Sequence, residues 1–524
     1  MIQRLEDLPS DSAWNGVSLR AIQIARSAAA NWIATVSTLV VSCFLAPFLV
    51  HRLGNTEYGV WVLALSITSN LYLLDVGLRS SVLRFVARSH AVGNHEEASR
   101  VVSAAFWVRL RIGGLALLLA LIISLIFPRV FHISEPLGTS AQKAVVVIGL
   151  SVCLSMPMSA IGAVLSALNR YDLQSYVSLL QLAIRVGGVV LVLLHGKGIL
   201  AIAICEIAAS LVGHSLTIII ARSIYPELQI RMETPSREVL RPLWSYGTYS
   251  FILLVSMQLI YQTDNLIVGA CISTVGVTLY SIGNSLCRYA QQLFSALTNT
   301  FVSAASVYEV SGSQMRLRGL YLNGTRIVLA LSLPIQMTLI TRPHSFIGLW
   351  MGPQYAGPAG AVTTVLAIAL TLSLLNSTAS SIAVGTGRHK PVAMWTIAEA
   401  LSNVLLSILL ARRMGLMGVA IGTLLPSIIV NLGLWPYFIP QIVGVGRTEI
   451  LRRILIPAVI CATPFTICSL LMEIYAPPHT IAKFVYQTLS LLPIFYSAAI
   501  VLHWGSIKRE LLPRLMARRI GAGE

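Results

Sequence analysis

Charged residues are scarce in this chain. Only 11% of its 524 residues are Asp, Glu, Lys or Arg, whereas a soluble domain carries about 25%. Hydrophobic residues make up 56% of the sequence, and the mean hydropathy is +0.78. A core this apolar could not be covered by polar surface in water, so lipid must surround most of the molecule. Apolar runs recur from residue 27 to residue 504, and each is long enough to span a bilayer core of about 30 Å.

Sequence motifs of catalysis and metal binding are also missing. The chain has no phosphate-cradling Gly-x-x-x-x-Gly-Lys-Ser/Thr loop, no His-Glu-x-x-His and no Gly-x-Ser-x-Gly. Its seven cysteines form no Cys-x-x-Cys pair, and its ten histidines lack the spacing of metal ligands. Nothing in the pattern assembles a nucleophile with a base. These absences predict a protein that is not an enzyme and has neither a cofactor nor a metal site.

The formal net charge of +17 has two possible explanations. A soluble protein with this charge would suggest a nucleic-acid partner, but no nucleic-acid-binding motif accompanies it. Cytoplasmic loops of membrane proteins collect Lys and Arg. With the N-terminus inside, 27 of the 37 Lys and Arg residues fall in inside segments, eight fall in outside loops, and Arg185 and Arg288 lie within the membrane. We therefore expect no nucleic-acid partner and two cytoplasmic termini.

The apolar segments predict an all-α, polytopic membrane protein with about 14 transmembrane helices. No expected loop exceeds about 30 residues, so no soluble catalytic domain fits between them. The expected spans are 27–50, 59–78, 107–127, 144–166, 177–195, 199–221, 246–270, 277–303, 327–349, 361–384, 393–411, 418–441, 454–473 and 483–504.

Two further patterns organise the chain. Residues 79–106 mix apolar and charged side chains, which is typical of an amphipathic helix at the membrane surface. Residues 55–67, which enter the second expected span, resemble residues 273–282, which enter the eighth. A repeat distance of six spans gives both copies the same orientation, as in transporters built from parallel repeats.

Ionisable side chains within the spans are the main candidates for function. Each costs about 2.5–3.5 kcal/mol at the membrane centre, so each must face a partner or water. Helical spacing aligns them with neutral polar residues into stripes that cannot face acyl chains. Such stripes include Ser178, Gln181 and Arg185; Gln258, Tyr261, Gln262 and Asn265 with Asp264 beside them; Asn284, Arg288, Gln291, Ser295 and Thr298; and Thr396, Glu399, Asn403 and Ser407.

The stripes have a structural and a functional interpretation, and the sequence leaves both open. The neutral residues could simply join helices by hydrogen bonds. Arg185 and Arg288 could form buried pairs with Glu206 or Asp264, or line a water-filled cationic cavity that receives an anion. Asp264, Glu206 and Glu399 could be ion-pair partners or could couple transport to protons or ions.

Several short motifs resemble a known family. Residues 52–61 read Arg-Leu-Gly-Asn-Thr-Glu-Tyr-Gly-Val-Trp, followed by Leu-Leu-Asp-Val-Gly-Leu at 73–78 and Leu-Arg-Phe-Val-Ala-Arg at 83–88. Residues 261–269 read Tyr-Gln-Thr-Asp-Asn-Leu-Ile-Val-Gly, followed by Val-Gly-Val-Thr-Leu-Tyr at 275–280. They resemble the openings of the two halves of Wzx-type O-antigen and polysaccharide flippases, in the multidrug/oligosaccharidyl-lipid/polysaccharide exporter superfamily.

The resemblance implies two six-helix bundles around a central cationic cavity, with two additional C-terminal helices. The corresponding domains are a cytoplasmic segment at 1–26, an N-terminal bundle at 27–222, a linker at 223–245, a C-terminal bundle at 246–441, the additional helices at 442–504 and a basic cytoplasmic tail at 505–524. The implied location is the bacterial inner membrane. The implied partners are membrane lipids, a polyprenyl-pyrophosphate-linked oligosaccharide as substrate, and a polysaccharide polymerase with its chain-length machinery.

Residues and resemblance together predict a flippase that works by ion- or potential-driven alternating access. Arg offers bidentate, permanently charged recognition of phosphate, so Arg185 and Arg288 would hold the pyrophosphate. Polar neighbours would contact the substrate, and carboxylates would couple ions. Two alternatives remain: a drug or metabolite antiporter of the same superfamily, and a membrane glycosyltransferase, ligase or polymerase. The substrate set is Arg185, Arg288, Tyr261, Gln258, Asn284 and Gln291, and the ion-coupling set is Asp264, Glu206 and Glu399.

Overall fold

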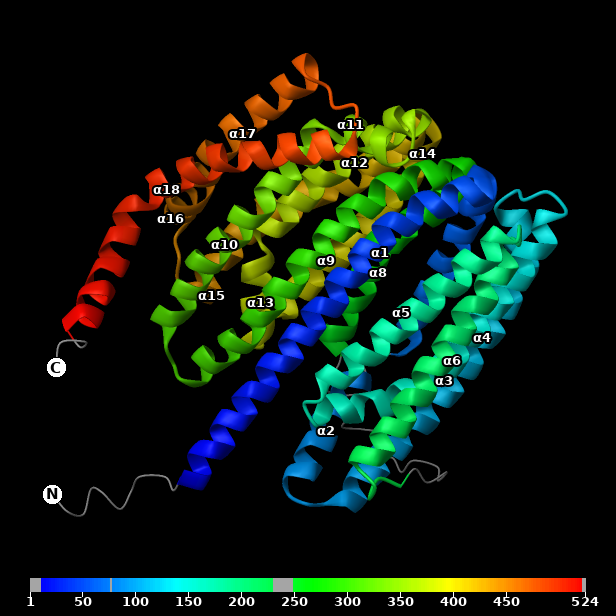
Figure 1. Ribbon diagram of the computed structural model, residues 1–524, viewed down its shortest axis with the longest axis horizontal. Coiled ribbons are helices and arrows are strands. Elements are labelled where there is room, and N and C mark those ends of the chain that lie inside the picture. Colours follow the sequence, from blue (N-terminus) through cyan, green and yellow to red (C-terminus); the bar gives the residue numbers. More distant parts are fainter. Residues whose placement is uncertain (1–10, 76–77, 230–247, 521–524) are drawn as a thin grey trace. The chain divides into compact units, whose positions relative to one another are not determined.

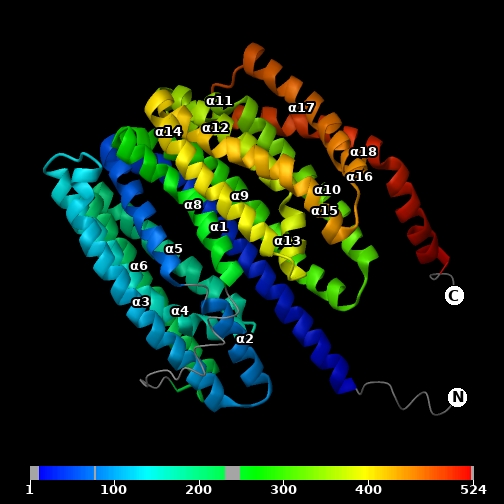
Figure 2. The ribbon, with the colours of Figure 1, turned by 180° about the vertical axis from the view of Figure 1, so that it is seen from behind.

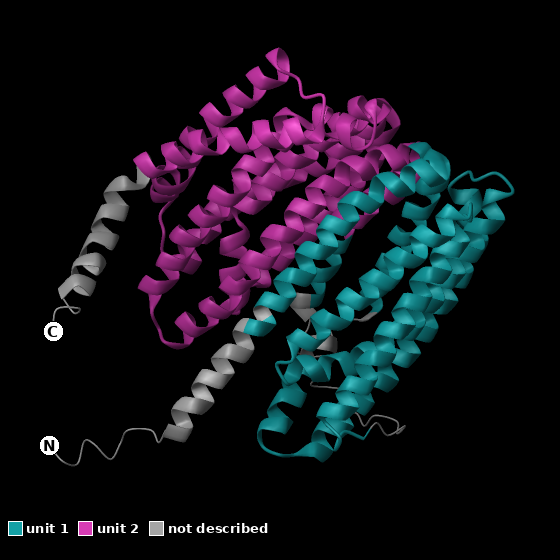
Figure 3. Ribbon diagram, in the orientation of Figure 1, with its two compact units in different colours: residues 1–258, 273–275 teal, residues 259–272, 276–524 magenta. Residues whose placement is uncertain are grey.

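The computed structural model describes residues 11–75, 78–229 and 248–520, and every regular element in them is helical (Figures 1 and 2). The chain divides into two compact units, residues 1–258 with 273–275 (unit 1) and residues 259–272 with 276–524 (unit 2) (Figure 3). The domain boundaries expected from the sequence stay a prediction. Much of the expected linker at 223–245 lies outside the described residues.

Unit 1 begins with one very long helix and continues through shorter ones. Its elements are α1 (Asp11–Leu71), the 3-10 turn η2 (Tyr72–Asp75), α2 (Leu78–Ala91), α3 (His95–Val130), α4 (Leu137–Ala167), α5 (Tyr171–Leu194) and α6 (Ile199–Ile224). The first residues of α8 (Thr248–Cys271) also belong to it, and the rest of α8 belongs to unit 2.

Unit 2 contains long helices joined by short helical segments and two π-helical stretches. Its elements after α8 are α9 (Thr274–Val310), α10 (Gln314–Thr341), α11 (Pro343–Trp350), α12 (Pro353–Leu375), α13 (Ser377–Gly385), α14 (Lys390–Ile428), η3 (Ile429–Leu434), α15 (Trp435–Val443), α16 (Arg447–Ile450), η4 (Leu451–Leu455), α17 (Ile456–Tyr475) and α18 (Ile481–Ile520).

Glycines break two long helices, α1 and α14, into membrane-sized pieces. At 61 residues, α1 would be about 90 Å long if it were straight. Gly54 interrupts it with φ +76°, and Gly415 interrupts α14 with φ +60°. Glycine adopts positive φ readily because it has no Cβ. Gly54 therefore separates the first two expected spans, and Gly415 separates the eleventh from the twelfth.

The number of crossings follows from these breaks. Within the described residues, 11 helical ranges are long and apolar enough to cross a membrane. Two of them, Ala29–Leu74 and Lys390–Val443, contain the glycine joints and supply two crossings each. The eighth expected span corresponds to α9, which is 37 residues long but carries a polar stripe that keeps it out of that set. The prediction of an all-α polytopic protein with about 14 crossings is confirmed.

Small residues let neighbouring helices approach closely. In unit 1, α4 packs against both α3 and α6. A Cβ on Gly113 of α3 would lie 2.6 Å from the Cys153 carbonyl oxygen of α4. In unit 2, a Cβ on Gly283 of α9 would lie 2.7 Å from the Ala359 carbonyl oxygen of α12. Close backbone approach is the usual source of helix association in lipid, where apolar contact gives little advantage.

The expected amphipathic helix is confirmed over half its range. Residues 78–91 form α2, which buries Val82 and Val86 and exposes Arg84 and Arg88. The remainder of residues 79–106 is different, because His95 already begins α3. Asn94 caps α3 by accepting the Glu97 backbone N–H at 3.0 Å, and such a cap defines a helix start.

Arg342 lies at the junction between α10 and α11. It is one of the eight Lys and Arg residues that the charge count assigns to outside loops, and its side chain is completely buried in this junction. Its Nε donates to Glu473 Oε2 at 3.0 Å and its Nη2 donates to Gln487 Oε1 at 2.6 Å. The guanidinium also lies over the Phe484 ring, 4.9 Å from its centroid. These partners belong to α17 and α18, so Arg342 attaches the last two helices to the junction of α10 and α11.

Candidate functional site

The polar stripes of α8 and α9 meet inside unit 2. Arg288 of α9 donates from Nη1 to Gln262 Oε1 of α8 at 2.9 Å. The neighbouring Tyr261 hydroxyl interacts with the side chains of Gln291 and Ser373. Arg288 has no carboxylate oxygen within 4.0 Å among the residues the structure describes. Its positive charge is therefore held in place by a neutral amide and is not cancelled by an acid.

Glu399 of α14 belongs to the same polar centre. It interacts electrostatically with Tyr261, as does Arg288. Within the described part of the chain, no Lys, Arg or His nitrogen lies within 4.0 Å of the Glu399 carboxylate. Tyr261 thus interacts with both a partly buried cation and a partly buried acid. We call this group of residues the Tyr261 centre (Tyr261, Gln262, Arg288, Gln291 and Glu399).

Asp264 lies beside this centre in a network of hydroxyl groups. Only 3% of the residue is exposed. Its Oδ2 accepts the Tyr280 hydroxyl at 2.6 Å and the Thr423 hydroxyl at 3.0 Å. Its Oδ1 is buried and accepts no hydrogen bond from the described residues. A buried carboxyl with neutral donors on one oxygen and a free second oxygen can take up a proton or a small cation.

Arg185 is paired with Glu206, as the structural interpretation of the polar stripes expected. Its Nη1 lies 3.7 Å from Glu206 Oε1, with side-chain exposures of 36% and 27%. Both residues belong to unit 1, where α5 packs against α6. This is a loose pair, because a direct charged hydrogen bond would measure about 2.7–2.9 Å. An incoming anion can therefore compete for the guanidinium.

Two predicted substrate residues lie along the same stripes. Asn284 is one turn before Arg288 on α9 and is partly exposed, and Gln258 is one turn before Tyr261 on α8. The structure thus brings Tyr261, Gln291, Arg288 and Glu399 together in unit 2, and Arg185 and Glu206 together in unit 1. Their assignment to substrate or ion binding stays a prediction.

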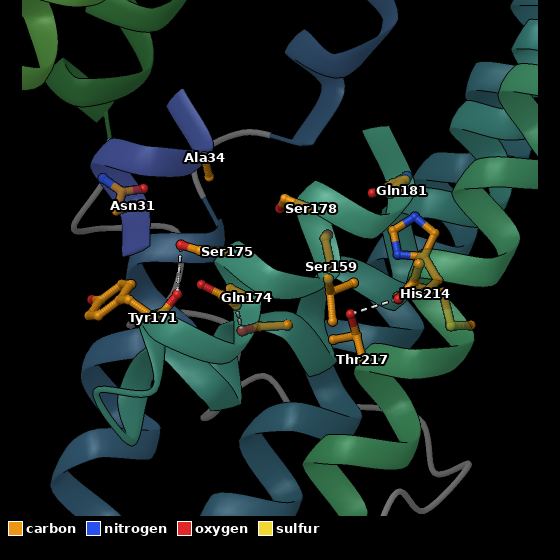
Figure 4. A pocket seen from close by; sticks show the side chains of 14 residues that line it. Asn31, Ala34, Ser159, Tyr171, Gln174, Ser175, Ser178, Gln181, His214 and Thr217 are labelled. Carbon is orange, nitrogen blue, oxygen red and sulfur yellow. Dashed lines mark hydrogen bonds between the residues drawn. The ribbon is translucent and has the colours of Figure 1, made fainter. Parts of the chain in front are cut away.

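Unit 1 contains a polar pocket that the sequence analysis did not identify as a site. Its volume is about 340 Å³, within the range of about 300–1,000 Å³ usual for small-molecule sites. Figure 4 shows Asn31 and Tyr171 at one end and Gln181 and His214 at the other. The lining residues come from α1, α4, α5 and α6: Asn31, Ala34, Met158, Ser159, Gly162, Tyr171, Gln174, Ser175, Val177, Ser178, Gln181, Gly213, His214 and Thr217.

A signal for this pocket was present in α5. The stripe of Ser178, Gln181 and Arg185 continues back through Gln174 to Tyr171 at the same helical spacing. His214 gave no signal of its own, because a single histidine in a span is compatible with many roles. Only the packing of α6 on α5 places it opposite Gln181.

A charged network lies next to the Tyr171 end of the pocket. Arg26 Nη2 of α1 donates to Asp172 Oδ2 at 2.6 Å, and Arg170 Nε donates to Asp172 Oδ1 at 3.2 Å. Two arginines share one acid, which leaves one net positive charge in this cluster. Asp172 is almost fully buried, whereas the Arg26 side chain is 55% exposed.

Comparisons with known proteins agree with this architecture. The family model described as "Polysaccharide biosynthesis protein" matches residues 48–359. A Bacillus subtilis (strain 168) protein described as "Uncharacterized membrane protein EpsK" is 24% identical over 454 residues, covering 84% of this chain and 88% of that protein.

Two solved structures show the same fold. The inward closed conformation of the lipid II flippase MurJ superposes with a TM-score of 0.64 at 15% identity, covering 91% of this chain and 99% of that chain. An inward-facing multidrug resistance MATE family transporter of the MOP superfamily also gives 0.64, at 16% identity, covering 78% of this chain and 98% of that chain.

The matched region is more than half of the chain, so the chain belongs to the polysaccharide biosynthesis protein family. It is a multi-pass membrane protein with the fold of known transporters. The resemblance to polysaccharide flippases, which was noted from short motifs, is confirmed at the level of the family.

Proposed function

We propose that this protein is a flippase for a polyprenyl-pyrophosphate-linked oligosaccharide. It would carry this lipid from the cytoplasmic to the periplasmic leaflet of a bacterial inner membrane, where a polymerase and its chain-length machinery would receive it. The observation that supports this most is the bond from Arg288 to the neutral Gln262 at 2.9 Å. A permanently charged guanidinium without an acidic partner, inside a membrane protein of polysaccharide biosynthesis, is suited to receive an anion.

The physical need for such a residue comes from the substrate. A pyrophosphate is a dense anion, and hydrocarbon offers nothing to replace its hydration. Arg288 would replace part of that hydration, and Arg185 would do the same when it releases Glu206. Tyr261, Gln291, Gln258 and Asn284 would contact the neutral part of the substrate.

Transport also needs a source of energy, and Asp264 is suited to supply the coupling. Its buried Oδ1 accepts no hydrogen bond from the described residues, and its Oδ2 already holds Tyr280 and Thr423. Binding of a proton or small cation would remove an uncompensated buried charge and so change the relative stability of two conformations. Glu399 would serve as a second coupling group, whereas Glu206 is engaged by Arg185.

A genetic experiment tests the proposal directly. Cells lacking the gene should accumulate lipid-linked oligosaccharide on the cytoplasmic leaflet and lose surface polysaccharide. The native gene should restore export, and Arg288→Ala should fail to do so at an unchanged protein level. Arg413→Ala is the matched control, because it removes an exposed arginine of α14.

Two results would contradict the proposal. Normal polysaccharide in the Arg288→Ala and Arg185→Ala strains would show that neither guanidinium handles the substrate. Unchanged polysaccharide in the deletion strain, together with new sensitivity to cationic drugs, would favour the antiporter of the same superfamily.

A further inference from the structure

The pocket of unit 1 has two chemically distinct sets of polar side chains. The first set is satisfied by the protein itself. Ser175 donates to its own helix at 2.9 Å, Thr217 does so at 2.8 Å, and Gln174 donates to the Gly162 carbonyl oxygen at 2.7 Å. Gln174 also accepts from Ser166 at 3.0 Å. This set shapes the pocket but offers little free hydrogen-bonding capacity.

The second set is Asn31, Ser178, Gln181 and His214, and its side chains are free. They make no hydrogen bond or ion pair with any residue that the structure describes, and they face one cavity of about 340 Å³. Two amides, one hydroxyl and one imidazole together provide both donors and acceptors. Asn31 and Ser178 are exposed, Gln181 and His214 are partly buried, and all four are available to a ligand that enters the pocket.

The charge of the pocket narrows the ligand class. No Asp, Glu, Lys or Arg is among its lining residues. A free inorganic anion or cation would find no opposite charge there, and an apolar drug would bury the free amides without pairing them. An uncharged ligand rich in hydroxyl and amide groups would pair with all four side chains. Saccharides are ligands of this kind.

The position of the pocket fits a sugar attached to a phosphate. Tyr171 begins α5, and Gln181 lies ten residues further on, which is about 15 Å along the helix. The pocket therefore extends from the end of the helix to about half the depth of a bilayer. The net positive cluster of Arg26, Arg170 and Asp172 lies at the Tyr171 end of the pocket. Arg185 lies one turn beyond the Gln181 end.

Gly213 leaves space for the side chain of Gln181 at that end of the pocket. A Cβ at this position of α6 would lie 2.9 Å from the Cδ and Oε1 atoms of Gln181. The amide must therefore lie directly on the glycine backbone, which holds it opposite His214. An alanine at this position would displace the amide and narrow the space for the ligand.

We propose that this pocket is a saccharide subsite, in which Asn31, Ser178, Gln181 and His214 bind one sugar of the lipid-linked substrate. The inference rests on the proposed function for the lipid pyrophosphate part of that substrate. The four free side chains recognise the sugar itself, while Arg185, one turn beyond Gln181, contacts its phosphate.

The test uses the full-length protein in lipid nanodiscs and three synthetic short-chain polyprenyl pyrophosphates. One carries N-acetylglucosamine, one carries galactose and one carries no sugar. The native protein should bind at least one sugar-bearing probe about tenfold more tightly than the sugarless probe. Gln181→Leu and His214→Leu should each reduce that preference about fivefold and leave binding of the sugarless probe unchanged.

Three further variants guard against trivial results. Ser178→Ala changes an exposed residue and tests the same site with little risk to folding, and Gly213→Ala should reduce the sugar preference by displacing Gln181. Gln441→Leu makes the same chemical change as Gln181→Leu on the exposed surface of α15, and it should leave the preference intact. All variants should give monodisperse protein by size-exclusion chromatography.

The outcomes separate the subsite from the flippase. Equal binding of all three probes by the native protein, or an undiminished sugar preference in the folded variants, overturns the subsite. Transport of the probes by the native protein in proteoliposomes would still support the flippase in that case. Conversely, a sugar preference that depends on Gln181 without any transport supports the subsite and contradicts the flippase.

Discussion

Glu57 accepts the backbone N–H of Ile199 on its carboxylate Oε1 at 2.9 Å, across 142 residues of sequence. Ile199 begins α6, and its first N–H groups have no partner within the helix. Glu57 follows the break of α1 at Gly54 and lies in the Asn-Thr-Glu-Tyr-Gly stretch that marks the family resemblance. This motif residue therefore has a structural role: it caps another helix of the same unit.

Removal of this cap should lower stability. Glu57→Ala should reduce the free energy of unfolding by about 1 kcal/mol, the usual effect of losing a helix cap. Glu57→Gln should reduce the free energy of unfolding by less, because its amide oxygen can still accept the hydrogen bond from the Ile199 N–H. Thermal unfolding in detergent measures the effect. Glu96→Ala, which breaks an exposed pair with Arg100, is the control and should change little. Equal melting temperatures for Glu57→Ala and for the control would contradict the capping role of Glu57.

The neutrality of Gln262 is central to the proposed anion site. Gln262→Glu preserves the shape of the side chain but places a carboxylate beside Arg288, 2.9 Å from its Nη1. This pair would occupy the guanidinium, so affinity for a polyprenyl-pyrophosphate sugar should fall about tenfold or more, the equivalent of one charged hydrogen bond. Binding in nanodiscs measures it, and Gln441→Glu is the surface control. Unchanged affinity would show that Arg288 does not contact the anion.

Asp264 should control energy coupling without controlling the fold. Asp264→Asn keeps an oxygen that can accept from Tyr280 and Thr423, so the protein should express and purify like the native form. It cannot bind a proton or cation in the same way, so transport should no longer respond to an imposed proton or sodium gradient. A leaflet-accessibility assay in proteoliposomes measures this response. Glu309→Gln, at a partly exposed pair with Arg388, is the control. Full gradient dependence in Asp264→Asn would exclude Asp264 from coupling.

Arg342 should matter for stability far more than for transport. Arg342→Leu removes the guanidinium that donates to Glu473 Oε2 and Gln487 Oε1 and leaves Glu473 only the hydroxyl of Ser345, in the junction between α10, α17 and α18. Loss of one partner of a buried pair costs about 3–5 kcal/mol, whereas replacement of both partners by apolar residues is often neutral. We therefore expect a large loss in thermal stability for Arg342→Leu and substantial recovery for the Arg342→Leu/Glu473→Leu double variant. An equal loss in both would show that the pair itself contributes the stability.

Much of the fold could be predicted because lipid imposes simple requirements on sequence. Apolar runs of sufficient length become crossings, and each expected span has a helical counterpart in the structure. The helix ends are less predictable: α10 begins at Gln314, 13 residues before the expected span at 327–349, and ends at the junction with α11. Such boundaries depend on packing partners, which local apolarity does not specify.

The charges inside the spans could be identified, but their partners could not. Arg288, Asp264 and Glu399 are conspicuous because ionisable groups are costly in hydrocarbon. The sequence does not show that Arg288 binds an amide rather than an acid, or that Asp264 accepts a hydroxyl from Thr423, 159 residues away. The sequence likewise does not show that Arg342 is buried, because its partner Glu473 lies 131 residues further along the chain.

By itself, the sequence determined that this chain is embedded in lipid as a bundle of helices. Its long apolar runs must pair their backbone N–H and C=O groups internally, because lipid offers these groups no hydrogen-bond partner. It also determined which few charges would need an explanation. Tertiary structure decided how those charges are used, because a side chain acquires its partner only when distant helices pack together. The saccharide pocket is the clearest case: its free side chains come from α1, α5 and α6, and only their packing makes one cavity of them.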